Sequence, residues 1–268
     1  MNEAAIDGSV RTTALQPATG HGGWREGVVV LAVVLAPVGL AIVLSTSGVL
    51  GYAGWTLAHG DLPNWPTWRT LQPVGMLAYV VSGWLAVAAA WRWSQRRGLR
   101  REVFLFRRLT WPATVASLAG FVIALYGAPA ATHWLSHVTG GAGPGGRIDF
   151  HNPYVTAIYL MLFVITAPLC EEILYRGLLV AWLRRIGWHD SAIWLVGSLI
   201  FGANHIIPIS LVWRMVMTGF GAMLFGLRLR YDSITPAWLT HVLFNAQPFL
   251  ILPLIGRFAP ALHPGYIS

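Results

Sequence analysis

The fold is decided by a stretch in the second half of the chain, residues 153–177, which reads PYVTAIYLMLFVITAPLCEEILYRG. Its apolar run is long enough to cross a hydrocarbon core of ~30 Å as a helix, and it ends in two adjacent glutamates and an arginine. Charged side chains are costly at such depth, so those that occur usually have a function. The stretch therefore predicts a membrane-spanning helix that carries a functional site at Glu171, Glu172 and Arg176.

The rest of the chain is similarly apolar. Of its 268 residues, 56% are hydrophobic and 10% are charged, which is too apolar for a soluble domain of this length. The apolar runs predict an all-α fold, a polytopic integral membrane bundle with seven or eight transmembrane helices. Seven runs are assigned to helices: residues 24–50, 71–91, 109–135, 153–185, 192–207, 210–229 and 234–255.

A segment rich in glycine and proline, residues 140–152, is the clearest break in composition, because glycine and proline at this density do not sustain a helix. It divides the chain into an N-terminal membrane part of three helices and a C-terminal part that carries the site. The expected organisation is a disordered cytoplasmic tail over 1–23, the three-helix part over 24–139, the loop, the catalytic core over 153–258 and a tail over 259–268.

The basic residues predict the orientation. All 18 are arginines and the net charge is +8, but no basic stripe interleaved with aromatic residues indicates nucleic-acid binding. Seven of them lie within residues 91–108, between two apolar runs. The positive-inside bias places this linker and the N-terminus in the cytoplasm, in a multi-pass protein of the cell membrane. The single cysteine, Cys170, excludes an intramolecular disulfide and a cysteine-based metal site.

Polar side chains on three predicted helices lie at similar depth. The sequences FGANH at 201–205 and HVLFN at 241–245 place His205, His241 and Asn245 inside apolar runs. At a rise of ~1.5 Å per residue, Glu171, His205 and His241 lie ~20, ~21 and ~16 Å from the expected inner ends of their helices, at Arg184, Ser191 and Arg230. We therefore expect the three side chains to meet in one layer.

The spacing gives the two glutamates different roles. Glu172 and Arg176 are four residues apart and pair on one helix face, whereas Glu171 projects about 100° away and stays unpaired. Desolvation raises the pKa of a carboxyl group, so that a carboxylate beside a histidine can take a proton from water. His241 and Asn245 could donate hydrogen bonds to the oxyanion that forms when water attacks a peptide carbonyl. These groups predict a hydrolase.

Two other classes of protein remain open. In a non-catalytic immunity factor or scaffold, the same polar layer would hold the helices together. In a small transporter, Glu171 and the histidines would relay protons. The chain shows no internal repeat, which weighs against the transporter.

The three motifs EEILYR, FGANH and HVLFN, in this order, resemble those of the CAAX prenyl protease 2 family and its bacterial relatives, the CPBP (Abi) intramembrane proteases. The resemblance covers about residues 150–256. It implies an intramembrane endopeptidase that acts on membrane-associated peptides or proteins. Glu171 would activate water with His205, His241 and Asn245 would form the oxyanion hole, and Glu172 with Arg176 would support the site.

The resemblance leaves the cofactor open, because the family has also been described as metallopeptidases. Glu171, His205 and His241 could form a three-ligand zinc site with an open position. Against zinc, the chain has no H-E-x-x-H motif, and no further carboxylate is left as a base unless Glu172 leaves Arg176. We favour a mechanism without a cofactor. The all-arginine basic set is typical of a bacterial member, for which prenylated substrates are not expected; the sequence indicates no oligomeric state.

Overall fold

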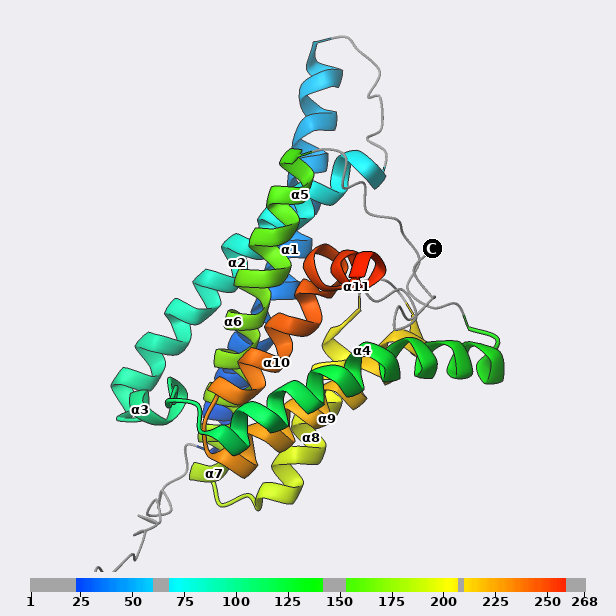
Figure 1. The fold of residues 1–268 in the computed structure, drawn as a ribbon. Coiled ribbons are helices and arrows are strands. Elements are labelled where there is room, and N and C mark those ends of the chain that lie inside the picture. Colours follow the sequence, from blue (N-terminus) through cyan, green and yellow to red (C-terminus); the bar gives the residue numbers. More distant parts are fainter. Residues whose placement is uncertain (1–22, 60–67, 142–152, 207–209, 259–268) are drawn as a thin grey trace, which may run out of the picture.

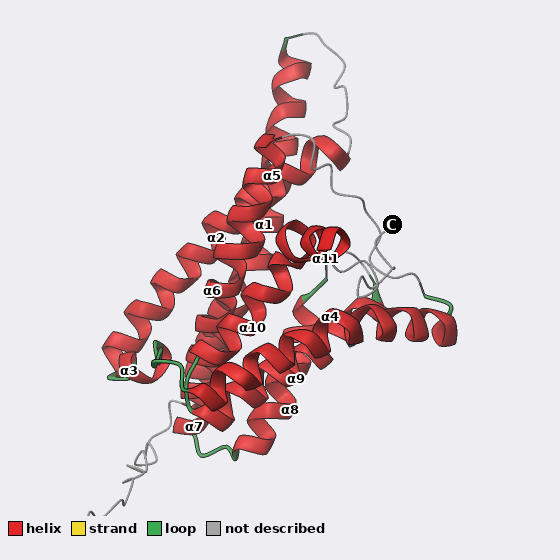
Figure 2. Ribbon diagram, in the orientation of Figure 1, coloured by secondary structure: helices red, strands yellow, loops and turns green. Residues whose placement is uncertain are grey.

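The computed structural model describes residues 23–59, 68–141, 153–206 and 210–258. Within these ranges every regular element is a helix and there is no strand (Figure 2). Five of the described helical segments are long and apolar enough to cross a membrane. The all-α membrane architecture is therefore confirmed. The predicted tails, except for Gly23 at the start of the first helix, and residues 142–152 of the predicted loop lie outside the described residues.

The first half of the chain forms two long helices that pack side by side, α1 (Gly23–Ala58) and α2 (Trp68–Arg97) (Figure 1). They are joined at mid-length by the hydroxyl of Ser82, which donates to the carbonyl of Pro37 at 2.8 Å. The short helix α3 (Arg100–Val103) and the long helix α4 (Trp111–Thr139) follow. Much of the outer surface of these helices is apolar, as expected for side chains that face lipid.

The central helix runs without interruption from Pro153 to Arg185. It consists of α5 (Pro153–Tyr159), η1 (Leu160–Thr166), α6 (Ala167–Glu171), η2 (Glu172–Leu179) and α7 (Val180–Arg185), of which η1 and η2 are π-helical. In its most apolar window 56% of the residues are buried, against 28% in each of the other four candidate spans. The helix that carries Glu171 is therefore the centre of the bundle. Segments of π-helix are rare and are frequently found at functional sites.

The second half continues with α8 (Asp190–Asn204), α9 (Leu211–Tyr231), α10 (Thr235–Ala246), η3 (Gln247–Ile251) and α11 (Leu252–Phe258). Helices thus form in both segments predicted as the fifth and sixth spans, but neither is among the five candidate spans. The reasons are physical: α8 has only 15 residues, and α9 carries three arginines. Helices α8 and α9 pack closely, because a Cβ atom at Gly202 would lie 2.7 Å from the carbonyl oxygen of Arg214.

One end of the bundle is tied together by arginines, and we call it the arginine-rich end. Arg107 before α4, Arg184 on α7 and Arg228 on α9 all contact the carboxylate of Asp232, at 2.9, 2.8 and 2.9 Å. Arg228 is buried and also donates to the carbonyl of Arg176 at 2.8 Å. Asp232 therefore connects this end of the bundle to the backbone of η2.

This cluster predicts a pH-dependent contribution to stability. Burial alone would raise the pKa of Asp232, but hydrogen bonds from Arg184 and Arg228 outweigh it and hold that pKa below its ordinary value of 3.8. The stabilisation that the Asp232 carboxylate provides is therefore complete at pH values above 3.8. It is lost as the pH falls through the lower pKa that Asp232 has in the folded state. Asp232→Asn should lower the free energy of unfolding in detergent by roughly 1 to 2 kcal/mol at neutral pH, a value reduced by the partial exposure of Asp232.

The matched control is Asp190→Asn, because Asp190 is half-exposed and contacts only Arg184 of the three arginines. Its effect on the free energy of unfolding should be smaller at neutral pH. The difference between wild type and Asp232→Asn should shrink in acid, once the carboxyl group of the wild type is protonated. If both variants lost the same free energy of unfolding at all pH values, this account of the arginine cluster would be contradicted.

Candidate active site

The structure brings both glutamates together with His241. The central helix places Glu171 at the end of α6 and Glu172 at the start of η2, and His241 reaches them from α10. Nδ1 of His241 lies 2.9 Å from Oε1 of Glu172, and Nε2 lies 3.9 Å from Oε2 of Glu171. The imidazole thus stands between the two adjacent carboxylates.

The hydrogen bond to Glu172 fixes the tautomer of His241. An ionised carboxylate only accepts hydrogen bonds, so Nδ1 carries the proton that it donates to Glu172. Nε2 is then the ring nitrogen that faces Glu171, and it gains a proton only when the ring becomes an imidazolium. Glu172 would stabilise that imidazolium by its charge. The sequence predicted the pairing of Glu172 with Arg176 but not this second contact.

The predicted pair of Glu172 and Arg176 forms in the interior. Nη1 of Arg176 lies 3.2 Å from Oε1 of Glu172, and both side chains are fully buried. The guanidinium also lies 4.3 Å and 4.5 Å from the ring centroids of Phe201 and Phe225, and donates to the carbonyl of Gly221 at 3.3 Å. Arg176 therefore anchors η2 against α8 and α9 while it neutralises Glu172.

His205 is the C-cap of α8, where the helix ends. Its Nδ1 lies 2.7 Å from the carbonyl of Phe201. Because a carbonyl only accepts, Nδ1 donates, and Nε2 of the neutral ring is left as an acceptor. Glu171, His241 and Arg176 are all near enough to interact with this ring electrostatically. The layer of Glu171, His205 and His241 expected from their depth is thus present.

Asn245 contacts the central helix. Its side-chain Nδ2 donates to the carbonyl of Phe163 at 2.9 Å, and so ties α10 to η1. An amide nitrogen carries two protons, so one N–H is used for this contact and one is left.

Tyr79 is the site residue that sequence reasoning missed. It lies on α2, in the N-terminal part, and its hydroxyl donates to Oε1 of Glu171 at 2.7 Å. The one signal in the sequence was a tyrosine in the middle of an apolar span, where a hydroxyl group needs a hydrogen-bond partner. Nothing in its spacing indicated that this partner is Glu171.

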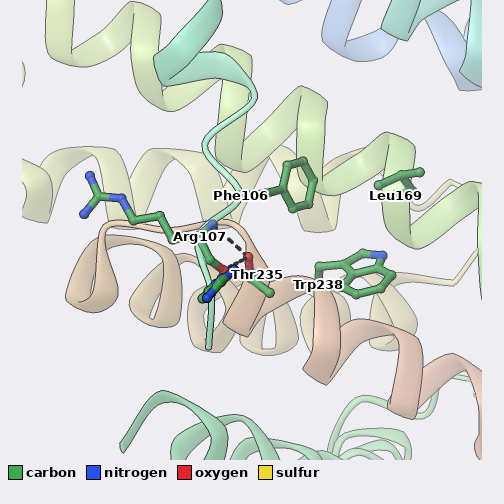
Figure 3. A pocket seen from close by; sticks show the side chains of 6 residues that line it. Phe106, Arg107, Leu169, Thr235 and Trp238 are labelled. Atoms are coloured by element: carbon green, nitrogen blue, oxygen red, sulfur yellow. Dashed lines mark hydrogen bonds between the residues drawn. The ribbon is translucent and has the colours of Figure 1, made fainter. Parts of the chain in front are cut away.

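A cavity of about 550 Å³ opens near the site, at the arginine-rich end (Figure 3). It is lined by Phe106, Arg107, Arg108, Leu169, Thr235 and Trp238. Leu169 lies two residues before Glu171 and so projects from a different face of α6. None of the site residues Tyr79, Glu171, Glu172, Arg176, His205, His241 and Asn245 lines this cavity. The candidate site is therefore located by the hydrogen bonds among these residues and not by the cavity.

The zinc alternative would use Glu171, His205 and His241 as ligands. Within the part of the chain that the structure describes, no three His, Cys, Asp or Glu side chains are grouped so that they could hold a metal ion. Nδ1 of His205 donates to a carbonyl and Nδ1 of His241 donates to Glu172, which leaves Nε2 of each ring available to bind other groups. We assign no step to a metal.

The fold and the site define a class of protein, the helical membrane proteins that enclose ionisable side chains between their spans. The comparison with known families is more specific: residues 153–247 match the family described as type II CAAX prenyl endopeptidase Rce1-like. This match supports a relationship of this part of the chain to the CAAX protease (CPBP) family of membrane endopeptidases. No curated protein and no solved structure matches the chain. The matched range contains all six site residues predicted from the sequence, but it does not contain Tyr79.

Proposed function

We propose that the chain is an intramembrane endopeptidase that hydrolyses peptide bonds of membrane-associated peptides or proteins, with Glu171 as the general base. The observation that carries the proposal is the position of His241 between Glu171 and Glu172, within the segment that matches the protease family. A separation of 3.9 Å between Nε2 of His241 and Oε2 of Glu171 is too long for a direct hydrogen bond. It suits a water molecule that contacts both atoms.

In the first step Glu171 takes a proton from this water as the oxygen attacks the peptide carbonyl carbon. Nε2 of the neutral His205 ring is a second acceptor that can orient the same water. The carbonyl oxygen becomes an oxyanion. It accepts hydrogen bonds from Nε2–H of protonated His241 and from the remaining N–H of Asn245. Glu172, bonded to the opposite nitrogen of His241, holds the imidazolium in place.

In the second step the tetrahedral intermediate collapses and the bond between carbon and nitrogen breaks. The protonated Glu171 passes its proton to the leaving amine and returns to a carboxylate. One water is consumed, and one new carboxyl group and one new amine are formed. No metal takes part in this scheme.

We further propose that the protein lies in the cell membrane with its N-terminus in the cytoplasm. The five apolar spans support a membrane protein, and the arginines gathered around Asp232 support one cytoplasmic end by the positive-inside bias. The site would then act on substrates that enter from the inner leaflet. The composition supports a bacterial member, whose substrates would not need a prenyl group.

The test is a cleavage assay with purified protein in lipid vesicles. The probes are membrane-linked peptides of varied sequence, one set with a prenyl anchor and one with a different lipid anchor, and products are identified by mass spectrometry. We expect defined cleavage products that are unchanged by exhaustive chelation. Activity lost on chelation and restored by zinc would overturn the metal-free mechanism. A folded protein that cleaves neither set would overturn the peptidase and favour the non-catalytic membrane role.

A further inference from the structure

The two oxygens of the Glu171 carboxylate have different partners. Oε1 accepts a hydrogen bond from Tyr79 at 2.7 Å, while Oε2 lies 3.9 Å from Nε2 of His241. A carboxylate on a flexible side chain can rotate and exchange its oxygens. A short hydrogen bond to one oxygen opposes this rotation and leaves the other oxygen directed at the histidine.

Helix α2 is positioned for this contact by close packing against the central helix. A Cβ atom at Gly83, one turn after Tyr79, would lie 3.3 Å from Sγ of Cys170, the residue directly before Glu171. The glycine therefore lets the two helices approach beside the site. Ser82 strengthens the same region, because its hydroxyl contacts the carbonyls of Pro37 and Tyr79.

Several other charged or titratable groups lie close to Glu171. They come from its own helix and from α8 and α10, and they are Cys170, Glu172, Tyr175, Arg176, His205 and His241. Arg176 is engaged with Glu172, and His241 donates its Nδ1 proton to Glu172. Among the hydrogen bonds of the described residues, the Tyr79 hydroxyl is the direct donor to Glu171.

We propose that Tyr79 is a positioning residue of the peptidase: it holds Oε1 of Glu171 so that Oε2 receives the proton of the attacking water. This inference rests on the proposed function. Its consequence is that the N-terminal part of the chain completes the active site, although the family match does not include it.

The test is Tyr79→Phe, which removes the hydroxyl group and keeps the ring. We expect kcat to fall by about 10- to 100-fold, the range for one hydrogen bond to a charged group, with KM nearly unchanged. The thermal unfolding temperature should stay close to that of the wild type.

The matched control is Tyr231→Phe, which removes a hydroxyl hydrogen bond to the carbonyl of Pro112 at the arginine-rich end. It should leave kcat and KM unchanged. A Tyr79→Phe enzyme with wild-type kcat, or with an unchanged kcat and a raised KM, would overturn the inference. If the wild type cleaves and Glu171→Gln does not, a contradicting result for Tyr79→Phe rejects only the role of Tyr79. If the wild type does not cleave at all, the proposed function itself fails.

Discussion

Glu171→Gln is expected to lower kcat by roughly 10²- to 10⁴-fold, the range found when a general base is removed. Glutamine has nearly the same shape, and its amide oxygen can still accept the hydrogen bond from Tyr79. It cannot, however, take a proton from water. Since Glu171 is only 12% exposed and has no ion pair with Arg176 among the described contacts, the fold should tolerate the change. The loss should therefore appear in kcat rather than in protein yield.

The measurement is the initial rate of peptide cleavage in vesicles, at equal amounts of folded protein. The matched control is Glu26→Gln, which neutralises a carboxylate on α1 that pairs with Arg97 at the arginine-rich end. An ion pair of this kind contributes about 0 to 1 kcal/mol, so the control should keep wild-type activity. If Glu171→Gln retained more than a tenth of the activity, Glu171 would not be the general base.

Arg176→Met is expected to cause the largest loss of stability. It leaves Glu172 buried without its cationic partner, and removal of one member of a buried ion pair costs about 3 to 5 kcal/mol. The methionine fills the space between Phe201 and Phe225 but cannot donate to the carbonyl of Gly221. The free energy of unfolding in detergent should fall accordingly, measured by thermal or denaturant unfolding.

The double variant Arg176→Met with Glu172→Gln separates stability from activity. It removes the unpaired charge, so much of the lost stability should return, because a buried ion pair can be replaced by neutral groups at little cost. Activity should stay low, since His241 has lost the carboxylate that holds its imidazolium. A double variant no more stable than Arg176→Met would contradict this view of the pair.

Local spacing in the sequence was sufficient for part of the site. The interval of four residues predicted the pair of Glu172 and Arg176, and the structure confirms it. Depth along apolar runs placed Glu171, His205 and His241 in one layer, and the three side chains do lie close together. Both inferences needed only the rise and the periodicity of a helix.

Contacts between helices could not be predicted in the same way. A span that is apolar on every side has no periodicity to show which face meets its neighbour, so the position of Tyr79 next to Glu171 was not evident. The contact of His241 with Glu172 depends on how α10 packs, and Asn245 turned out to contact η1. The π-helical segments η1 and η2 were not predicted either, because no pattern of residue types indicates them.

The number of membrane spans could not be predicted from local sequence either. Residues 192–207 and 210–229 are apolar, and both contain helices, yet neither helix meets the length and composition of a span. Short helices of this kind are stabilised in the bundle by close contacts such as the one at Gly202. The sequence shows the apolar run but not the neighbouring helix that covers it.

The most direct test of the central claim, attack by water that Glu171 activates, is a single-turnover cleavage in water labelled with oxygen-18. Direct attack predicts one labelled oxygen in each newly formed carboxyl group, and a Glu171 side chain that carries no label. An unlabelled product together with label in Glu171 would contradict the claim, because it would show that Glu171 forms a covalent intermediate with the substrate that water then opens at the side-chain carbonyl.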